Sequence, residues 1–128
     1  MAMVMSLGCE PPLSRTGTVL TDGVARGVYE IRANGTDLIP VTVIFPADAN
    51  GAPSARELPG VIFIQGGGVD PSRYEWQGVE LARKGFVTML PRHPLDLPIV
   101  AIDRARLTWT SGFSGTFMEG LVHPLRVG

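Results

Sequence analysis

The feature that most constrains this chain is the segment Leu58–Arg92, LPGVIFIQGGGVDPSRYEWQGVELARKGFVTMLPR. Its apolar run Val61–Ile64 is too short for a helix and is rich in β-branched residues. Such a run predicts a strand buried on both faces, as in parallel sheets. Gln65–Gly68 follows directly, and its glycines allow backbone conformations and close approaches that other residues prevent. The segment therefore predicts a strand that ends in a glycine-rich turn.

A helix with recognisable ends follows this turn. Ser72 and Glu75 have the spacing of a capping box, in which the two side chains bond free main-chain N–H groups at a helix start. Gly85 suits the position just beyond the last turn, and Phe86–Leu90, closed by Pro91, predicts a second strand. Strand, helix and strand form a βαβ unit, which should be right-handed. Its glycine turn lies at the carboxyl end of the first strand, where open α/β sheets bind ligands.

The residues before this unit predict an antiparallel hairpin. Val28–Ala33 has polar residues at alternate positions, Asn34-Gly35 is a strong turn signal, and Leu38–Phe45 is the expected return strand. Pro40 has no N–H to donate, which places the early part of the return strand at a sheet edge. A short strand is also expected at Thr18–Leu20.

The residues after the unit give weaker signals. Pro98 suits the first position of a helix, and apolar residues recur near one face over Ile99–Trp109, which predicts a helix there. Thr110–Gly120 is predicted to be a loop.

Composition excludes several classes of protein. The net charge is −1 and the 11 basic residues do not cluster, which argues against a nucleic-acid partner. No apolar run approaches the ~20 residues of a transmembrane helix. The single cysteine cannot form an internal disulfide, and no Cys or His spacing suggests a metal site. The composition therefore fits one globular domain, without a metal or a transmembrane span, whose oligomeric state stays open.

The N-terminal stretch MAMVMSLGCEPP resembles the end of a bacterial lipoprotein signal, in which Cys9 becomes the lipidated first residue. It departs from that pattern at Ser6 and in lacking a basic leading region. Lipidation at Cys9 implies an extracytoplasmic lipoprotein; the alternative is a frayed terminus with a free thiol in a cytoplasmic protein. We expect residues 1–27 to be an N-terminal tail and residues 28–128 to form the domain.

The order of these elements resembles the N-terminal half of an α/β-hydrolase, and more closely the group of dienelactone hydrolases, chlorophyllases and platelet-activating-factor acetylhydrolases. The matching pieces are VIFIQGGG, YEWQGVELARKGF and VTMLPRHP, and the resemblance covers Val28–Gly128. It implies a partial α/β-hydrolase fold, with an N-terminal β-hairpin followed by a parallel βαβ unit. Gln65 departs from the family at a position where histidine is common.

In that family the glycine turn stabilises an oxyanion. Acyl transfer builds negative charge on a carbonyl oxygen, and prepositioned backbone N–H groups stabilise it, each by ~3–4 kcal/mol in the transition state. The resemblance assigns these donors to Gly67 and Gly68, with Gln65 and Gly66 supporting the loop.

A nucleophile is harder to find. Ser114 lies in a sequence that superficially resembles G-x-S-x-G, but Thr116 stands where the final glycine belongs. No apolar strand leads into Ser114 and no helical pattern follows it, so we interpret this stretch as a loop. In the family the catalytic acid and base follow the serine, so neither His93 nor His123 is assigned as the base. Asp96 and Asp103 are interpreted as surface or capping residues, which leaves no catalytic triad in the chain.

The C-terminal residues Leu121–Gly128 look like the phrase that precedes the serine elbow in the family, with His123 where aspartate is usual. On this reading the chain ends two or three residues into the nucleophile strand and is a truncated serine hydrolase. The parent enzyme would cleave a carboxylic ester or a similar acyl bond of a small molecule, with Ser, His and Asp and without a cofactor. Val61–Ile64, lacking its outer neighbour, would be an exposed edge strand.

Two alternatives compete with this interpretation. The first is an NADP-binding, Rossmann-like domain, in which Arg92 would face the 2′-phosphate. Pro71 stands where the third glycine of that motif belongs, and Asp70 would face the pyrophosphate, so the match is poor. The second is a binding module whose glycine turn has no chemical role.

Overall fold

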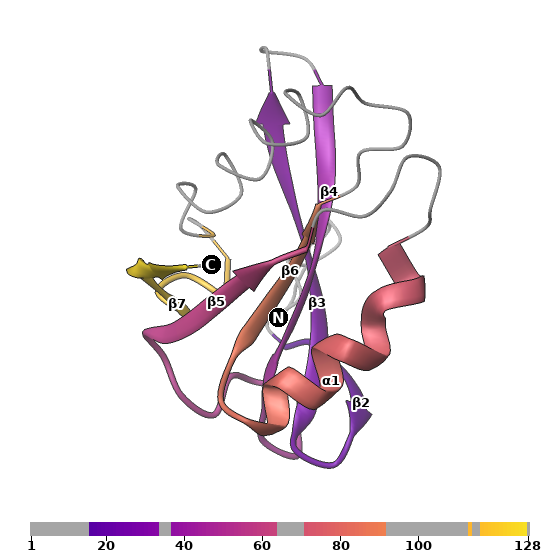
Figure 1. Ribbon diagram of the computed structural model, residues 1–128, viewed down its shortest axis with the longest axis vertical. Coiled ribbons are helices and arrows are strands. Elements are labelled where there is room, and N and C mark those ends of the chain that lie inside the picture. The colour runs from indigo at the N-terminus through magenta and orange to yellow at the C-terminus, as the bar shows by residue number, and fades with distance from the viewer. Residues whose placement is uncertain (1–15, 34–36, 64–70, 92–112, 114–115, 128) are drawn as a thin grey trace, which may run out of the picture.

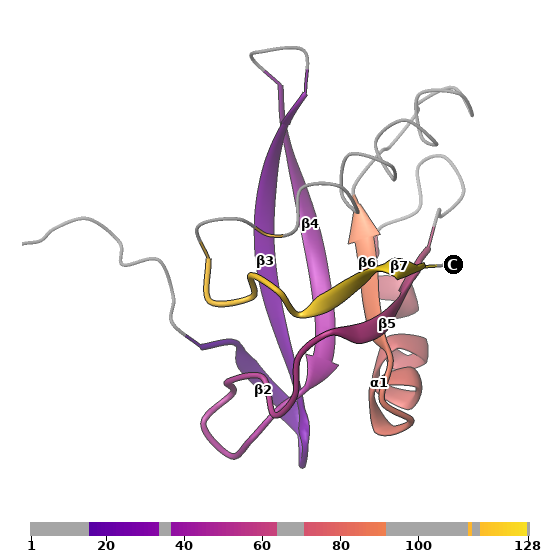
Figure 2. The same cartoon turned by 90° about the vertical axis from the view of Figure 1, so that its left-hand side faces the viewer.

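The computed structural model describes residues 16–33, 37–63, 71–91, 113 and 116–127. They form a six-stranded mixed sheet in the order β2-β3-β4-β6-β5-β7, with one α-helix packed on it (Figures 1 and 2). In chain order the elements are β2 (Thr18–Thr21), β3 (Val24–Ala33), β4 (Asp37–Pro46), β5 (Leu58–Ile62), the 3₁₀ turn η1 (Pro71–Tyr74), α1 (Glu75–Arg83), β6 (Val87–Pro91) and β7 (Val122–Val127).

The predicted hairpin is confirmed and is longer than expected. Strands β3 and β4 pair antiparallel from Val24↔Pro46 to Ala33↔Asp37. β3 begins four residues before the predicted start at Val28, because Val24 and Ala25 are buried in the core. The short strand expected at Thr18–Leu20 is confirmed as β2, and residues 24–27 lie in β3.

The edge position of Pro40 is also confirmed. β4 pairs with β6 only from Val41 to Ile44. Among the described residues, Asp37–Pro40 therefore has a neighbour on one side alone, β3. Because the last pair is Val41↔Pro91, the end of the hairpin extends past the carboxyl end of β6 (Figures 1 and 2).

The βαβ unit is confirmed, with a shift in its first strand. β5 and β6 pair parallel from Gly60↔Val87 to Ile62↔Met89, with α1 between them in sequence. β5 begins at Leu58, three residues before the prediction, and Ile64 lies outside the described residues. The expectation of burial on both faces is wrong for Val61 and Ile62, which are only half-buried. The ladder to β7 reaches only Gly60 among the described residues, which leaves the end of β5 less covered.

The prediction for the C-terminal end of α1 is confirmed, and the prediction for its N-terminal end is wrong. The capping box is wrong: the N-cap residue is Tyr74, which makes no side-chain capping bond. Gly85 is confirmed as the stop signal, with φ +89°. The N–H groups of Gly85 and Phe86 donate to the carbonyls of Ala82 and Leu81, both at 3.0 Å. This pair of bonds is a Schellman motif, which satisfies the free carbonyls at the helix end.

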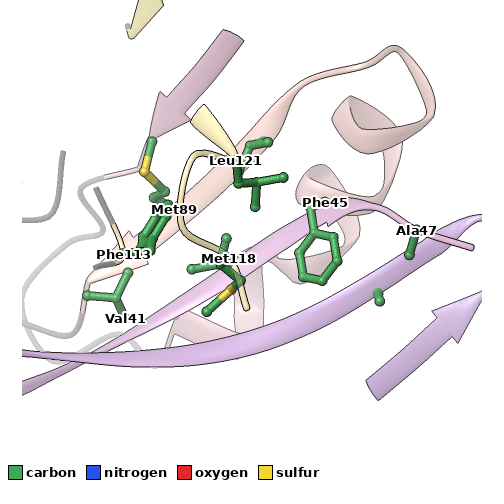
Figure 3. Close-up of a cluster of buried hydrophobic side chains, with 10 residues drawn as sticks. Val41, Phe45, Ala47, Met89, Phe113, Met118 and Leu121 are labelled. Atoms are coloured by element: carbon green, nitrogen blue, oxygen red, sulfur yellow. The ribbon is translucent and has the colours of Figure 1, made fainter. Parts of the chain in front are cut away.

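Both faces of the sheet are covered. α1 packs on one face, over a cluster that includes Ile44 and Leu90. The segment that ends at Leu121 covers the other face (Figure 2). The described residues of the predicted loop Thr110–Gly120 form turns and bends, as expected. Two of them, Phe113 and Met118, are fully buried beside Met89 and Phe45 (Figure 3). Phe113 and Met118 therefore cover the face of the sheet opposite α1.

The predicted exposed edge was Val61–Ile64, and the strand β7 pairs with the part of β5 that precedes it, Leu58–Gly60. β7 pairs parallel with β5 at Leu58↔Val122 and Gly60↔Val127, with a register shift between the two pairs. β7 has six residues rather than two or three, because pairing already starts at Val122. Among the described strands β7 is the outermost on this side, and its irregular pairing and Arg126 are features that discourage pairing with another chain.

The remaining sequence predictions fall outside the described residues. They include the helix over 99–109, the Asn34-Gly35 turn and the assignment of Cys9. Within the part of the chain that the structure describes, no helix is long and apolar enough to cross a membrane.

Candidate functional site

The candidate site is the carboxyl edge of the three parallel strands. β6, β5 and β7 run in the same direction, so their carboxyl ends meet at one edge of the sheet. The predicted site residues Gln65, Gly66, Gly67 and Gly68 lie outside the described residues. The residues that flank them are described: β5 ends at Ile62 on one side, and η1 begins at Pro71 on the other. The loop is therefore attached where ligand sites of open α/β sheets occur.

The flank on the strand side is held by β6. The N–H of Phe63 donates to the carbonyl of Met89 at 2.9 Å, which extends the ladder between β5 and β6 by one residue. The ring of Phe63 meets the ring of Tyr74 edge to face, with centroids 6.3 Å apart and planes at 84°. Both rings are half-buried and pack against the cluster under α1.

The flank on the helix side is held by an ion pair. Arg26 on β3 donates from Nη1 to both carboxylate oxygens of Glu75, each at 3.0 Å. Glu75 is the first residue of α1, where a negative charge also complements the helix dipole. The sequence reading had assigned Glu75 to a capping box and had missed Arg26, whose partner lies 49 positions away.

Of the other candidate site residues from the sequence, the structure describes His123. His123 lies on β7, and its Nδ1 accepts a hydrogen bond from the N–H of Leu125 at 3.1 Å. His93, Asp96, Asp103 and Ser114 lie outside the described residues, as does Arg92. Among those described, no group of three or more His, Cys, Asp or Glu side chains could hold a metal ion.

A cavity of about 270 Å³ lies elsewhere, where β2 and β3 diverge. It is lined by Thr16–Thr18, Arg26–Val28 and Thr116–Met118. The hydroxyl of Thr116 is already engaged, since it donates to the carbonyl of Phe113 and accepts from the N–H of Met118. The guanidinium of Arg26 is engaged with Glu75. The sequence offered no signal for this cavity, because the segments that line it are far apart in the chain.

Comparison with solved structures identifies proteins with a similar fold. No protein-family model and no curated protein matches the chain. Among solved structures, it is similar to a thermophilic esterase from the planctomycete Thermogutta terrifontis with propionate bound, at 19% identity and a TM-score of 0.54. That match covers 82% of this chain and 39% of the esterase. Esterase 2 of the same organism, phosphorylated by paraoxon, matches at 20% identity and a TM-score of 0.50, covering 82% and 41% of the two chains.

The chain has an esterase-like, hydrolase-type fold. At these identities the likeness supports the fold alone, and this chain spans about two-fifths of the length of the esterases it matches. The comparison agrees with the predicted α/β-hydrolase resemblance at that level. The narrower group of dienelactone hydrolases, chlorophyllases and acetylhydrolases stays a prediction.

Proposed function

We propose that this chain is the N-terminal part of a serine hydrolase that acts on carboxylic esters or similar acyl bonds of small molecules. The observation that carries the proposal is the arrangement around β5. This strand lies between two parallel neighbours in an esterase-like sheet, and the glycine-rich stretch Gln65–Gly68 follows it in the sequence.

In the proposed mechanism the chain supplies the oxyanion site. The backbone N–H groups of Gly67 and Gly68 donate to the carbonyl oxygen of the ester as it gains negative charge. Gln65 and Gly66 support the loop. Nothing in this step needs a metal or a cofactor, because the donors are main-chain amides.

The nucleophile and its partners are assigned to residues beyond these 128. β7 lies beside β5, in the place that the nucleophile strand takes in the resembled family. A serine placed after that strand would be attached at the same edge of the sheet as the glycine turn. A histidine and an aspartate later in the parent chain would complete the triad.

The test begins with the DNA downstream of codon 128. A G-x-S-x-G elbow in frame supports the proposal, and the extended protein should hydrolyse short p-nitrophenyl esters. The 128-residue chain should not hydrolyse them, because it has no assigned nucleophile. Activity of that chain that disappears in Ser114→Ala would show that the rejection of Ser114 is wrong.

A binding module is the second candidate, and the cavity of about 270 Å³ favours it. A stop codon after position 128 together with no esterase activity would support this candidate over the hydrolase. The NADP-binding alternative predicts that NADPH protects the chain from unfolding, which the hydrolase proposal does not.

A further inference from the structure

The ladder between β5 and β7 contains an insertion on the β7 side. Leu58 pairs with Val122, and Gly60 pairs with Val127 (Figures 1 and 2). On β5 a single residue separates the two paired positions, whereas on β7 the four residues 123–126 separate them. β7 therefore carries three more residues than β5 in this stretch, and the regular ladder is interrupted there.

The backbone of β5 shows which hydrogen bond the insertion removes. The N–H of Leu58 donates to the carbonyl of Leu121 at 2.9 Å, so Leu58 turns its backbone groups toward β7. Because these groups alternate in direction along a strand, Gly60 also turns its own toward β7. In an unshifted parallel ladder Gly60 would pair with position 124, and its carbonyl would accept the N–H of Leu125. The observed pairing of Gly60 with Val127 takes that acceptor away from Leu125.

The imidazole of His123 replaces the lost acceptor. Its Nδ1 accepts the N–H of Leu125 at 3.1 Å, within β7 itself. A ring nitrogen accepts a hydrogen bond only while it carries no proton, so this bond requires a neutral imidazole with its proton on Nε2. The shifted register of β7 is thus tied to one protonation state of one side chain.

The charges around the ring offer no substitute for this bond. None of the ion pairs among the described residues involves His123. β5, the strand that pairs with β7, carries no charged residue. On β7 the other charged residue is Arg126, and Glu57 and Glu119 lie just before the two strands; all three are exposed. Protonation of the imidazole would therefore remove the bond to Leu125 without forming an ion pair that the structure describes.

We propose that His123 is a pH-sensitive switch for the register of β7. The neutral ring holds the N–H of Leu125, and a proton on Nδ1 turns this acceptor into a donor and releases it. The stability that the bond contributes is present at alkaline pH and is lost as the pH falls through the range, about pH 8 to 5, in which histidine takes up a proton. The inference does not rest on the proposed function, because it concerns only the pairing of β5 and β7.

The experiment is amide hydrogen exchange of the 128-residue chain, followed by NMR at about pH 8 and about pH 5. Rates are expressed as protection factors, which removes the intrinsic effect of pH on exchange. The amides of Leu125 and Gly60 report on the shifted register. The amide of Leu58, which is bonded before the insertion, is the internal control. Nitrogen spectra of the imidazole of His123 show which ring nitrogen carries the proton.

The variants separate the acceptor from its titration. In the wild type, the protection of Leu125 and Gly60 should fall roughly 2- to 10-fold between the two pH values, the factor for one hydrogen bond, while Leu58 stays unchanged. His123→Asn should keep its protection at both pH values, because an amide oxygen accepts regardless of pH. His123→Phe should give low protection at both. The chain has one other histidine, and His93→Gln should behave as the wild type does.

Three results would overturn the inference. They are a neutral ring that carries its proton on Nδ1, protection of Leu125 that does not change with pH in the wild type, and a pH response in His123→Asn as large as that of the wild type. The comparison of the wild type with His123→Asn decides the matter even if His123→Phe does not fold. No ester enters any of these measurements, so failure of the proposed function would leave them standing.

Discussion

The guanidinium of Arg56 donates a hydrogen bond to the main-chain carbonyl of Glu119 at 2.8 Å, across 63 positions of sequence. It donates a second bond to the carbonyl of Phe117 at 3.2 Å. Two main-chain bonds continue the contact: the N–H groups of Glu57 and Leu58 donate at 2.9 Å to the carbonyls of Gly120 and Leu121. These bonds join residues 117–121, which cover one face of the sheet, to the residues at the start of β5.

The first prediction concerns the two hydrogen bonds that Arg56 donates. Arg56→Ala should lower the free energy of unfolding by about 1 kcal/mol, because it removes two charge-assisted bonds at an exposed site. Denaturant unfolding measures the change. Arg83→Ala is the control, since its exposed pair with Glu80 at 3.4 Å should contribute under ~0.5 kcal/mol. Equal losses in the two variants would contradict the role given to Arg56.

The second prediction compares two glutamates on α1. Glu75→Gln should destabilise the chain by about 1 kcal/mol, since Glu75 accepts both bonds from Arg26 and is 24% exposed. Glu80→Gln should cost under ~0.5 kcal/mol, because that pair is 52% and 59% exposed. Raising the salt concentration should shrink the Glu75 effect only in part. Thermal unfolding at low and high salt measures both losses of stability. A larger loss in Glu80→Gln than in Glu75→Gln would contradict the prediction.

The third prediction concerns the close approach of α1 to β4. Alanine stabilises a helix by about 1 kcal/mol relative to glycine. In Gly78→Ala, however, the new Cβ would lie 2.6 Å from Cδ1 of the fully buried Ile44. Overpacking of this kind costs ~1–3 kcal/mol, so the net change should be destabilising.

The double variant with Ile44→Val tests the cause. Valine removes Cδ1, so the loss in the double variant should be smaller than the sum of the two single losses. Denaturant unfolding of all four proteins gives the coupling energy. Additive losses would mean that the clash with Ile44 is not what disfavours alanine.

The fourth prediction concerns a buried hydroxyl. Thr88 is fully buried on β6, and its Oγ1 has no hydrogen-bond partner that the structure describes. Thr88→Val keeps the shape and removes the hydroxyl, so stability should rise by about 1–2 kcal/mol. Thr88→Ser, which keeps the hydroxyl and loses the methyl group, should lower it. A less stable valine variant would indicate that the hydroxyl is bonded in solution.

The fifth prediction concerns the proposed oxyanion site. In the extended enzyme, Gly67→Val should lower kcat ~10²–10³-fold with a smaller change in KM, because the donors act mainly in the transition state. Steady-state kinetics on a short p-nitrophenyl ester would measure both. A variant that folds normally and keeps its full kcat would remove Gly67 from the site.

The features predicted correctly are those that depend on neighbours in sequence. Gly85 ends α1 because a residue with φ +89° is needed directly after the last turn. The hairpin and the βαβ unit follow from alternating or continuous apolar runs and from the turn residues between them.

The features that were missed depend on distant partners. Glu75 has the right spacing for a capping box, but Arg26 of β3 takes its carboxylate. Phe113 and Met118 belong to a segment with no period, so nothing local marks them as core. At the candidate site, the predicted glycine turn lies outside the described residues and stays a prediction. The contact between Phe63 and Tyr74 was missed, because ring contacts leave no pattern in the chain.

The pairing of β7 with β5 has a consequence for synthesis on the ribosome. β5 can pair with β6 soon after it emerges, but its other neighbour begins only at Val122. At about 5–20 residues per second, the 31 residues from Pro91 to Val122 take roughly 2–6 s to make. During this interval one edge of β5 has unpaired N–H and C=O groups. The apolar side chains on the sheet face that Phe113 and Met118 will cover are also exposed. A nascent chain paused between β6 and β7 should therefore be a substrate for chaperones that bind extended apolar segments.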